Sequence, residues 1–168
     1  GHINDTYKLS LGKDAQEYIL QRINTKVFHD PESIAQTHLK IQALMGDETE
    51  IPCIARLIPD AQGNNIVYDS HGGAWRLTSF IKDSYSVDVV LYPWQAYQAG
   101  IGYGWFVNHC SSLNPAALRE AIPNFHNLSF RLHQLDDAIK EDRAERKASV
   151  ADILSFFQQR RETLLGIE

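Results

Sequence analysis

The sequence contains few of the residues that build disulfide frameworks or metal clusters. Its two cysteines, Cys53 and Cys110, lie far apart and outside any Cys-x-x-Cys pattern. This usage excludes a disulfide scaffold and favours a reducing setting, so we expect a cytoplasmic protein with free thiols. The seven histidines form no His-x-x-x-His pair and have no cysteine at zinc spacing. We therefore expect no metal ligands in this chain.

Long apolar runs and an excess of positive charge are also missing. No run reaches the roughly 18 apolar residues that a transmembrane helix needs, and no basic and then apolar leader opens the sequence. Lysines and arginines number 16 against 21 aspartates and glutamates, which gives a net charge of −5, and the basic residues are scattered. We therefore expect neither a membrane surface nor a nucleic acid as a partner.

Motifs of nucleophilic and phosphate-binding enzymes are scarce. The sequence has no Gly-x-Ser-x-Gly elbow, and Cys110 follows His109 without the context of a thiolate nucleophile, so a hydrolase is not favoured. The alternate glycines of 100–104 could present bare backbone N–H groups to a phosphate. No Lys-Ser or Lys-Thr pair follows them, however, and they lie in a helical pattern rich in aromatic residues. We interpret them as positions where another helix or backbone segment approaches closely.

What is present is the composition of a folded protein. Hydrophobic residues make up 43% and charged residues 22% of the 168 residues, enough for one generous domain or two small lobes. Residues 6–10 and 18–23 have the β-branched, aromatic and alternating character of strands, and 12–16 supplies a turn, which predicts an antiparallel pair. Asp30 as N-cap, followed by a proline, predicts a helix over 31–45.

Three further strand-like runs follow, at 53–58, 65–70 and 75–81, with turn signals between them. Five strands with short connections make an antiparallel sheet on which one helix can pack. Strand signals end near residue 83. We therefore predict an α+β fold with a β-rich lobe over 1–83 and the start of a helical lobe over 84–168.

Several helical patterns occupy the second part of the sequence. A proline at position 93 opens an aromatic-rich helix through about residue 113, and Asn114-Pro115 marks another start. An amphipathic stripe predicts a further helix, and its members are Phe125, Leu128, Leu132, Leu135 and Ile139. The stretch from Ser149 to Asp152 has the pattern of a capping box before a last helix.

The first 24 residues combine features that suit the phosphates of a nucleotide. Residues 1–7 place a glycine and small polar side chains where a backbone can close on an anion. The following strand delivers one cation, Arg22, of the kind with which kinases hold the α- and β-phosphates of ATP. From spacing alone, Arg22 in a surface salt bridge is an equally good interpretation.

Five stretches, spread in order through most of the chain, are shared with a known family. They read GHINDTY at 1–7, YILQRIN at 18–24, VFHDPE at 27–32, WRLTSFI at 75–81 and IPNFHN at 122–127. Together they resemble the aminoglycoside phosphotransferase and choline kinase superfamily, most closely the branch containing N-acetylhexosamine 1-kinase. Some relatives in that branch are named mucin-desulfating, but this sequence has no Cys-x-Pro-x-Arg stretch for sulfatase chemistry.

The resemblance implies a protein-kinase-like fold in which a small β lobe covers a helical lobe, with ATP in the cleft and Mg²⁺ bridging its phosphates. Arg22 would take the place of the family's strand lysine. The middle of the helix at 31–45 lacks the family's glutamate, so Gln36 or His38 would face Arg22 instead. The resemblance assigns the phosphate-covering loop to Gly1, His2, Ile3, Asn4, Asp5 and Thr6, and the adenine-reading hinge to Ser79, Phe80 and Ile81.

The catalytic loop of that superfamily is not found in the sequence. Phosphoryl transfer there uses a loop resembling His-x-Asp-x-x-x-x-Asn and a second, metal-binding aspartate, and no such loop occurs among the 168 residues. We therefore expect a segment without catalytic residues of its own. Its catalytic loop would lie beyond Glu168, and its first strand would precede Gly1.

The expected activity belongs to the complete protein: ATP-dependent phosphorylation of a sugar hydroxyl, which in that branch is the anomeric hydroxyl of an amino sugar. The partners are then a nucleotide and a small sugar. The alternative is a non-catalytic nucleotide- or partner-binding module built on a kinase-like lobe. A lobe without its first strand has an open sheet edge, which favours self-association as a third interpretation.

Overall fold

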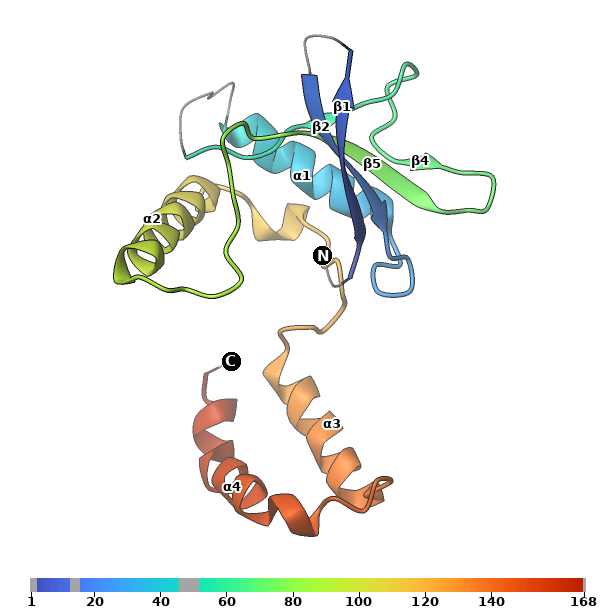
Figure 1. Cartoon of the computed structure of the whole chain (residues 1–168). Coiled ribbons are helices and arrows are strands. Elements are labelled where there is room, and N and C mark those ends of the chain that lie inside the picture. Colours follow the sequence, from blue (N-terminus) through green and yellow to red (C-terminus); the bar gives the residue numbers. More distant parts are fainter. Residues whose placement is uncertain (1–2, 13–15, 46–51, 168) are drawn as a thin grey trace. The chain divides into compact units, whose positions relative to one another are not determined.

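The computed structural model describes residues 3–12, 16–45 and 52–167, and it is an α+β protein (Figure 1). Within these ranges the chain forms five strands, four α-helices and two 3₁₀ helices, and every strand pairing is antiparallel. Close contacts divide the chain into two compact units, Gly1–Ala121 and Ile122–Glu168. The division into lobes at residue 83 stays a prediction.

The N-terminal hairpin has the antiparallel form that its sequence predicts. Strand β1 (Asp5–Leu11) pairs along its whole length with β2 (Gln16–Ile23), with a register that runs from Asp5 opposite Arg22 to Leu11 opposite Gln16. Gly12 follows β1 with a φ of +73°, a left-handed conformation that glycine adopts without strain. The rest of the predicted turn, 13–15, lies outside the described residues.

Strand β5 (Ala74–Ser79) holds the sheet together. It pairs with β2 on one side, and β3 (Leu57–Ile58) and β4 (Val67–Tyr68) both pair with it as well. The predicted strands at 53–58 and 65–70 are thus only two residues long. Two turns flank these strands: the Asp60 carboxylate accepts the N–H groups of Gln62 and Asn64, and the Asp69 carboxylate accepts those of His71 and Gly73.

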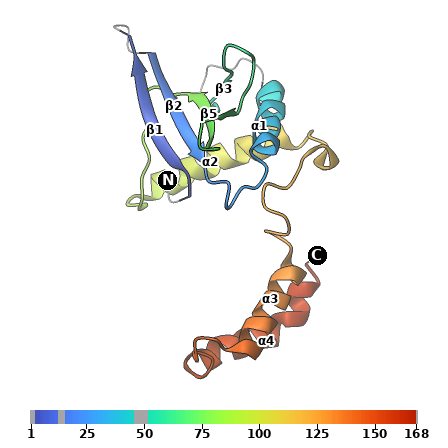
Figure 2. The same ribbon diagram turned by 90° about the vertical axis from the view of Figure 1, so that its right-hand side faces the viewer.

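Helix α1 (Pro31–Met45) has the bounds that its sequence predicts and packs on one face of the sheet (Figure 2). Its start is fixed by Asp30, whose Oδ1 accepts the N–H of Ser33 at 3.0 Å. Phe28, Ile34 and Leu39 border the core between helix and sheet, which consists of Ile23, Ala35, Leu57, Ile66 and Ala74. The predicted acidic loop at 46–50 lies outside the described residues.

Helix α2 (Pro93–Cys110) completes the first unit together with the 3₁₀ helix η1 (Pro115–Ala117), which Asn114 caps. The glycines of 100–104 lie inside α2, so the phosphate-loop alternative is wrong. The close approach that we expected at these glycines is also not seen. A Cβ added at each would meet nothing within 4 Å among the described residues.

The second unit is a pair of helices. Helix α3 (Leu128–Glu141) begins at Asn127, whose Oδ1 accepts the Phe130 N–H at 2.7 Å. The 3₁₀ helix η2 (Ala148–Val150) leads into α4 (Ala151–Leu165). The predicted capping box is wrong, because Ser149 lies inside η2 and its hydroxyl donates to the Arg146 carbonyl instead. Among the described helices, none combines the length and apolarity that crossing a bilayer requires.

Candidate functional site

The two faces of the sheet carry different side chains. Successive residues of a strand point to opposite faces, and residues paired across strands share a face. Ile23 and its partner Ala74 are buried in the core under α1, so every second residue from them lies on the same side. We call this side the helix face and the opposite side the outer face.

A polar row crosses the helix face on three strands. Thr6 of β1 pairs with Gln21 of β2, and Gln21 pairs with Arg76 of β5. The Gln21 amide joins them: its Nε2 donates to Thr6 Oγ1 at 3.0 Å, and its Oε1 accepts from Arg76 Nε at 3.0 Å and Nη2 at 2.7 Å. One neutral side chain therefore holds a hydroxyl and a guanidinium in fixed positions.

One α1 side chain, His38, interacts electrostatically with Arg76 of this row. Its Nε2 donates to the Ala55 carbonyl at 2.7 Å, which fixes the tautomer with the proton on Nε2. Burial lowers the pKa of His38, the Ala55 hydrogen bond acts in the other direction, and the positive charge of Arg76 lowers the pKa further. His38 is therefore neutral at physiological pH and brings no negative charge to Arg76.

A second group on the helix face combines a cation with an aromatic ring. Lys8 of β1 places its Nζ 3.9 Å from the centre of the Phe80 ring and 2.6 Å from Glu17 Oε1. The ion pair is partly exposed, so its net contribution to stability is small. Phe80 lies just beyond the end of β5, in the predicted hinge.

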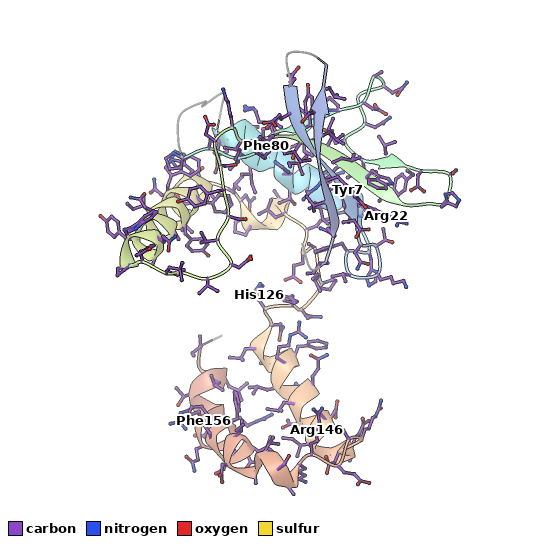
Figure 3. The ribbon with its side chains drawn as sticks, viewed as in Figure 1. Tyr7, Arg22, Phe80, His126, Arg146 and Phe156 are labelled. Carbon is purple, nitrogen blue, oxygen red and sulfur yellow. The ribbon has the colours of Figure 1, made fainter. Side chains whose placement is uncertain are left out.

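Arg22 lies on the outer face, away from α1. It is exposed, its guanidinium lies 5.9 Å from the Trp75 ring centre, and its charge helps to lower the pKa of Asp69. The indole N–H of Trp75 donates to Asp69 Oδ2 at 2.8 Å, and this bond is the first cause that holds the Asp69 pKa at about 2. Figure 3 labels Tyr7 and Arg22 near one end of the sheet and Phe80 near the other.

The outer face also carries apolar side chains. Tyr7 and Trp75 lie with their ring centres 6.2 Å apart. A shallow hollow of about 270 Å³ lies on this face, and its apolar lining includes Leu9, Leu20, Ile58, Val67, Trp75 and Leu77. Arg22 and Asp69 both lie beside Trp75, one of the residues that line this hollow.

The predicted hinge offers fewer free backbone groups than its three residues suggest. The N–H of Ser79 donates to the Arg56 carbonyl at 2.8 Å, and that of Phe80 donates to the Glu17 carbonyl at 3.4 Å. Among the described residues, the Ile81 N–H and the Phe80 carbonyl have no such backbone bond. These two groups are the ones on which an adenine edge could be read.

The predicted phosphate loop is divided between the two faces. Gly1 and His2 lie outside the described residues. Asn4 is tied to the end of β2, because its Oδ1 accepts the Asn24 N–H at 2.9 Å, whereas Ile3 is half exposed. Asp5 pairs with Arg22 and lies on the outer face, so only Thr6 of this loop reaches the polar row.

The structure therefore brings Thr6 and Phe80 to the same face and leaves Arg22 on the other. Lys8, Gln21 and Arg76 were missed from the sequence, although the alternation Ile19-x-Gln21-x-Ile23 could have indicated the face of Gln21. Across 3–12, 16–45 and 52–167, no three His, Cys, Asp or Glu side chains are grouped to hold a metal ion. A scan against known protein families finds none that matches this chain.

Proposed function

We propose that this chain is the nucleotide-binding part of an ATP-dependent phosphotransferase of the aminoglycoside phosphotransferase and choline kinase superfamily. The complete protein would transfer phosphate to the anomeric hydroxyl of an amino sugar, as the resemblance to the N-acetylhexosamine 1-kinase branch implies. The fold would then be a protein-kinase-like lobe, and the compartment the cytoplasm.

The observation that carries this proposal is the helix face. It combines a guanidinium, an ammonium and a hydroxyl with an aromatic ring, on a sheet whose one helix packs beside them. Phosphate oxygens suit the Arg76 and Thr6 donors, and the flat face of a base suits Phe80. The Phe80 N–H is bonded to the carbonyl of Glu17, which lies four residues before Gln21 on β2. Because Gln21 is the strand partner of both Thr6 and Arg76, about 13 Å separates these two residues from the level of Phe80. That separation is comparable to the length of an extended nucleoside triphosphate.

Mg²⁺ needs a separate test of fit. Octahedral Mg²⁺ is usually held by one or two carboxylates together with phosphate oxygens. The described residues offer no group of candidate ligands, and the Glu17 carboxylate is bonded to Lys8. The residues described here therefore do not fit a protein-bound metal, and no step of the proposed function is assigned to one.

A calorimetric titration of the 168-residue chain with ATP and with adenosine tests the proposal. We expect ATP to bind more tightly than adenosine, because the cations act only on the phosphates. We also expect no phosphate transfer to amino sugars by this chain, since it carries no catalytic aspartate loop. Absence of ATP binding would overturn the nucleotide site, and turnover would overturn the expectation of a non-catalytic segment.

A non-catalytic nucleotide-binding module is the second candidate, and one observation favours it. The α1 side chain whose pKa responds to Arg76 is a neutral histidine, whereas kinases pair a helix glutamate with the strand cation. A turnover assay on the longest natural form of the protein separates the two. Transfer to an amino sugar supports the kinase, whereas ATP binding without transfer supports the module.

A further inference from the structure

The strand register separates the two arginines that could contact phosphates. Arg22 is paired with Trp75, and both lie on the outer face. Arg76 lies two residues after the buried Ala74 and two residues before the buried Thr78 on β5, so it lies on the same helix face. A cation that meets a ligand beside α1 therefore comes from β5 and not from β2.

Arg22 has a negative group in its surroundings. The Asp69 carboxylate and the Arg22 guanidinium both lie close to Gly73, since a Cβ added there would be 2.4 Å from Asp69 Oδ2 and 3.0 Å from Arg22 Nε. Asp69 stays ionised down to a pKa of about 2, which three donors and the neighbouring Arg22 support. At neutral pH Asp69 is therefore ionised and its charge acts on the exposed Arg22.

The charge of Arg76 is not compensated in the same way. It is half-buried, and its partner Gln21 is neutral, as is His38. Within the described part of the chain, Arg76 makes no ion pair with a carboxylate. A partly desolvated cation without a counter-charge is costly, and an anionic ligand would remove that cost.

The arrangement around Arg76 also orients it. Gln21 Oε1 accepts from Nε and Nη2, which leaves the remaining N–H groups of the planar fork for a ligand. Because Thr6 Oγ1 accepts from Gln21 Nε2, its own hydroxyl hydrogen is free to donate. Lys8 lies two residues farther along β1 than Thr6, about 7 Å away on the same face.

We infer that Arg76, rather than Arg22, is the cation that holds the triphosphate of the bound nucleotide, with Thr6 as a further donor. Gln21 is the positioning residue that aligns Arg76 with Thr6. This inference rests on the proposed nucleotide site. It replaces the strand cation expected from the sequence with a residue from the next strand of the sheet.

The test uses calorimetric titrations with three probes, ATP, adenosine and inorganic tripolyphosphate, at one low salt concentration. The variants are Arg76→Gln, Gln21→Glu and the matched control Arg22→Gln. Gln21→Glu leaves Arg76 in place but gives it a carboxylate partner, so it remains informative if Arg76→Gln does not fold. Circular dichroism checks the fold of each variant.

We expect Arg76→Gln and Gln21→Glu to weaken ATP and tripolyphosphate binding by about tenfold or more. Adenosine binding should stay unchanged in both, and Arg22→Gln should change no affinity by more than about twofold. ATP binding that survives both variants, or is lost in Arg22→Gln alone, overturns the inference and leaves the proposed function standing.

The remaining outcomes separate the inference from the proposed function. If tripolyphosphate binding depends on Arg76 but ATP binds no better than tripolyphosphate, the anion site stands and the nucleotide function is overturned. If the unmodified chain binds neither ATP nor tripolyphosphate, both are overturned.

Discussion

The register of β2 decides which arginine lies beside α1, and a pair of core truncations tests it. Ile23, at the end of β2, is 3% exposed and packs in the core under α1. Leu11, at the end of β1, is 56% exposed. A slip of β2 by one residue would move Ile23 to the outer face and Arg22 to the helix face. The stability cost of Ile23→Ala therefore reports directly on the face assignment.

The expected magnitude follows from burial. Ile23→Ala removes three carbon atoms from the core, and at about 0.8 kcal/mol each the lost transfer free energy is about 2.4 kcal/mol. A residual cavity adds to this, so we expect a loss of about 3–4 kcal/mol in the free energy of unfolding. The control Leu11→Ala changes an exposed side chain, and we expect a change within about 0.5 kcal/mol.

Tryptophan fluorescence during urea unfolding is a selective assay. The three tryptophans of the chain are Trp75, Trp94 and Trp105, and all lie in the first unit. Their signal therefore reports the unfolding of that unit and not of the helix pair. Equal losses for Ile23→Ala and Leu11→Ala, or a loss below about 1 kcal/mol for Ile23→Ala, would refute the assignment of Ile23 to the core face.

Two further predictions concern single contacts. The Asp69 pKa is held at about 2 against an ordinary value of 3.8, so its contribution to stability is present in full above pH 3.8 and is lost as the pH falls through about 2; Asp69→Asn should remove this pH dependence of stability in unfolding curves from pH 5 to 2. Gly73→Ala, whose Cβ would displace the carboxylate, should raise the Asp69 pKa in an NMR titration. An unchanged pKa would contradict the hydrogen-bonded turn. Asn127→Ala removes the acceptor of the Phe130 N–H and should cost about 1 kcal/mol of stability in the second unit. Asn127→Asp keeps an acceptor at this position and should retain most of that stability. Backbone chemical shifts of α3 during denaturation measure both effects, and equal losses in the two variants would contradict the cap.

Local signals predicted the elements that local chemistry determines. The hairpin of β1 and β2 follows from alternating β-formers, and α1 begins at Pro31 because Asp30 caps it. The strands β3 and β4 were predicted too long, because β-prone residues indicate extended backbone but do not show how many of them pair with a neighbouring strand. The capping box at Ser149 failed because a 3₁₀ turn competes for the same hydroxyl.

The candidate site was harder to predict than the fold. Thr6 and Phe80 were found through resemblance, and both lie on or beside the helix face. Arg22 was selected because it is the cation of its strand, but the face on which it lies depends on which neighbour is buried. Ile23 occupies the core, which leaves Arg22 on the outer face, and Arg76 reaches the helix face only through the pairing of β5 with β2. Cross-strand pairing is a tertiary fact that a single sequence does not show directly.

The glycines of α2 have a consequence for how the first unit opens. Each of Gly100, Gly102 and Gly104 lowers helix stability by about 0.8–1 kcal/mol relative to alanine, and no residue of α2 is buried, so packing compensates little of that loss. Strand β5, by contrast, is bonded to β2, β3 and β4. We therefore expect amide protons of α2 to exchange with solvent through local fluctuations, and those of β5 to exchange only when the whole sheet unfolds. In that case α2 would melt before the sheet that carries the polar row.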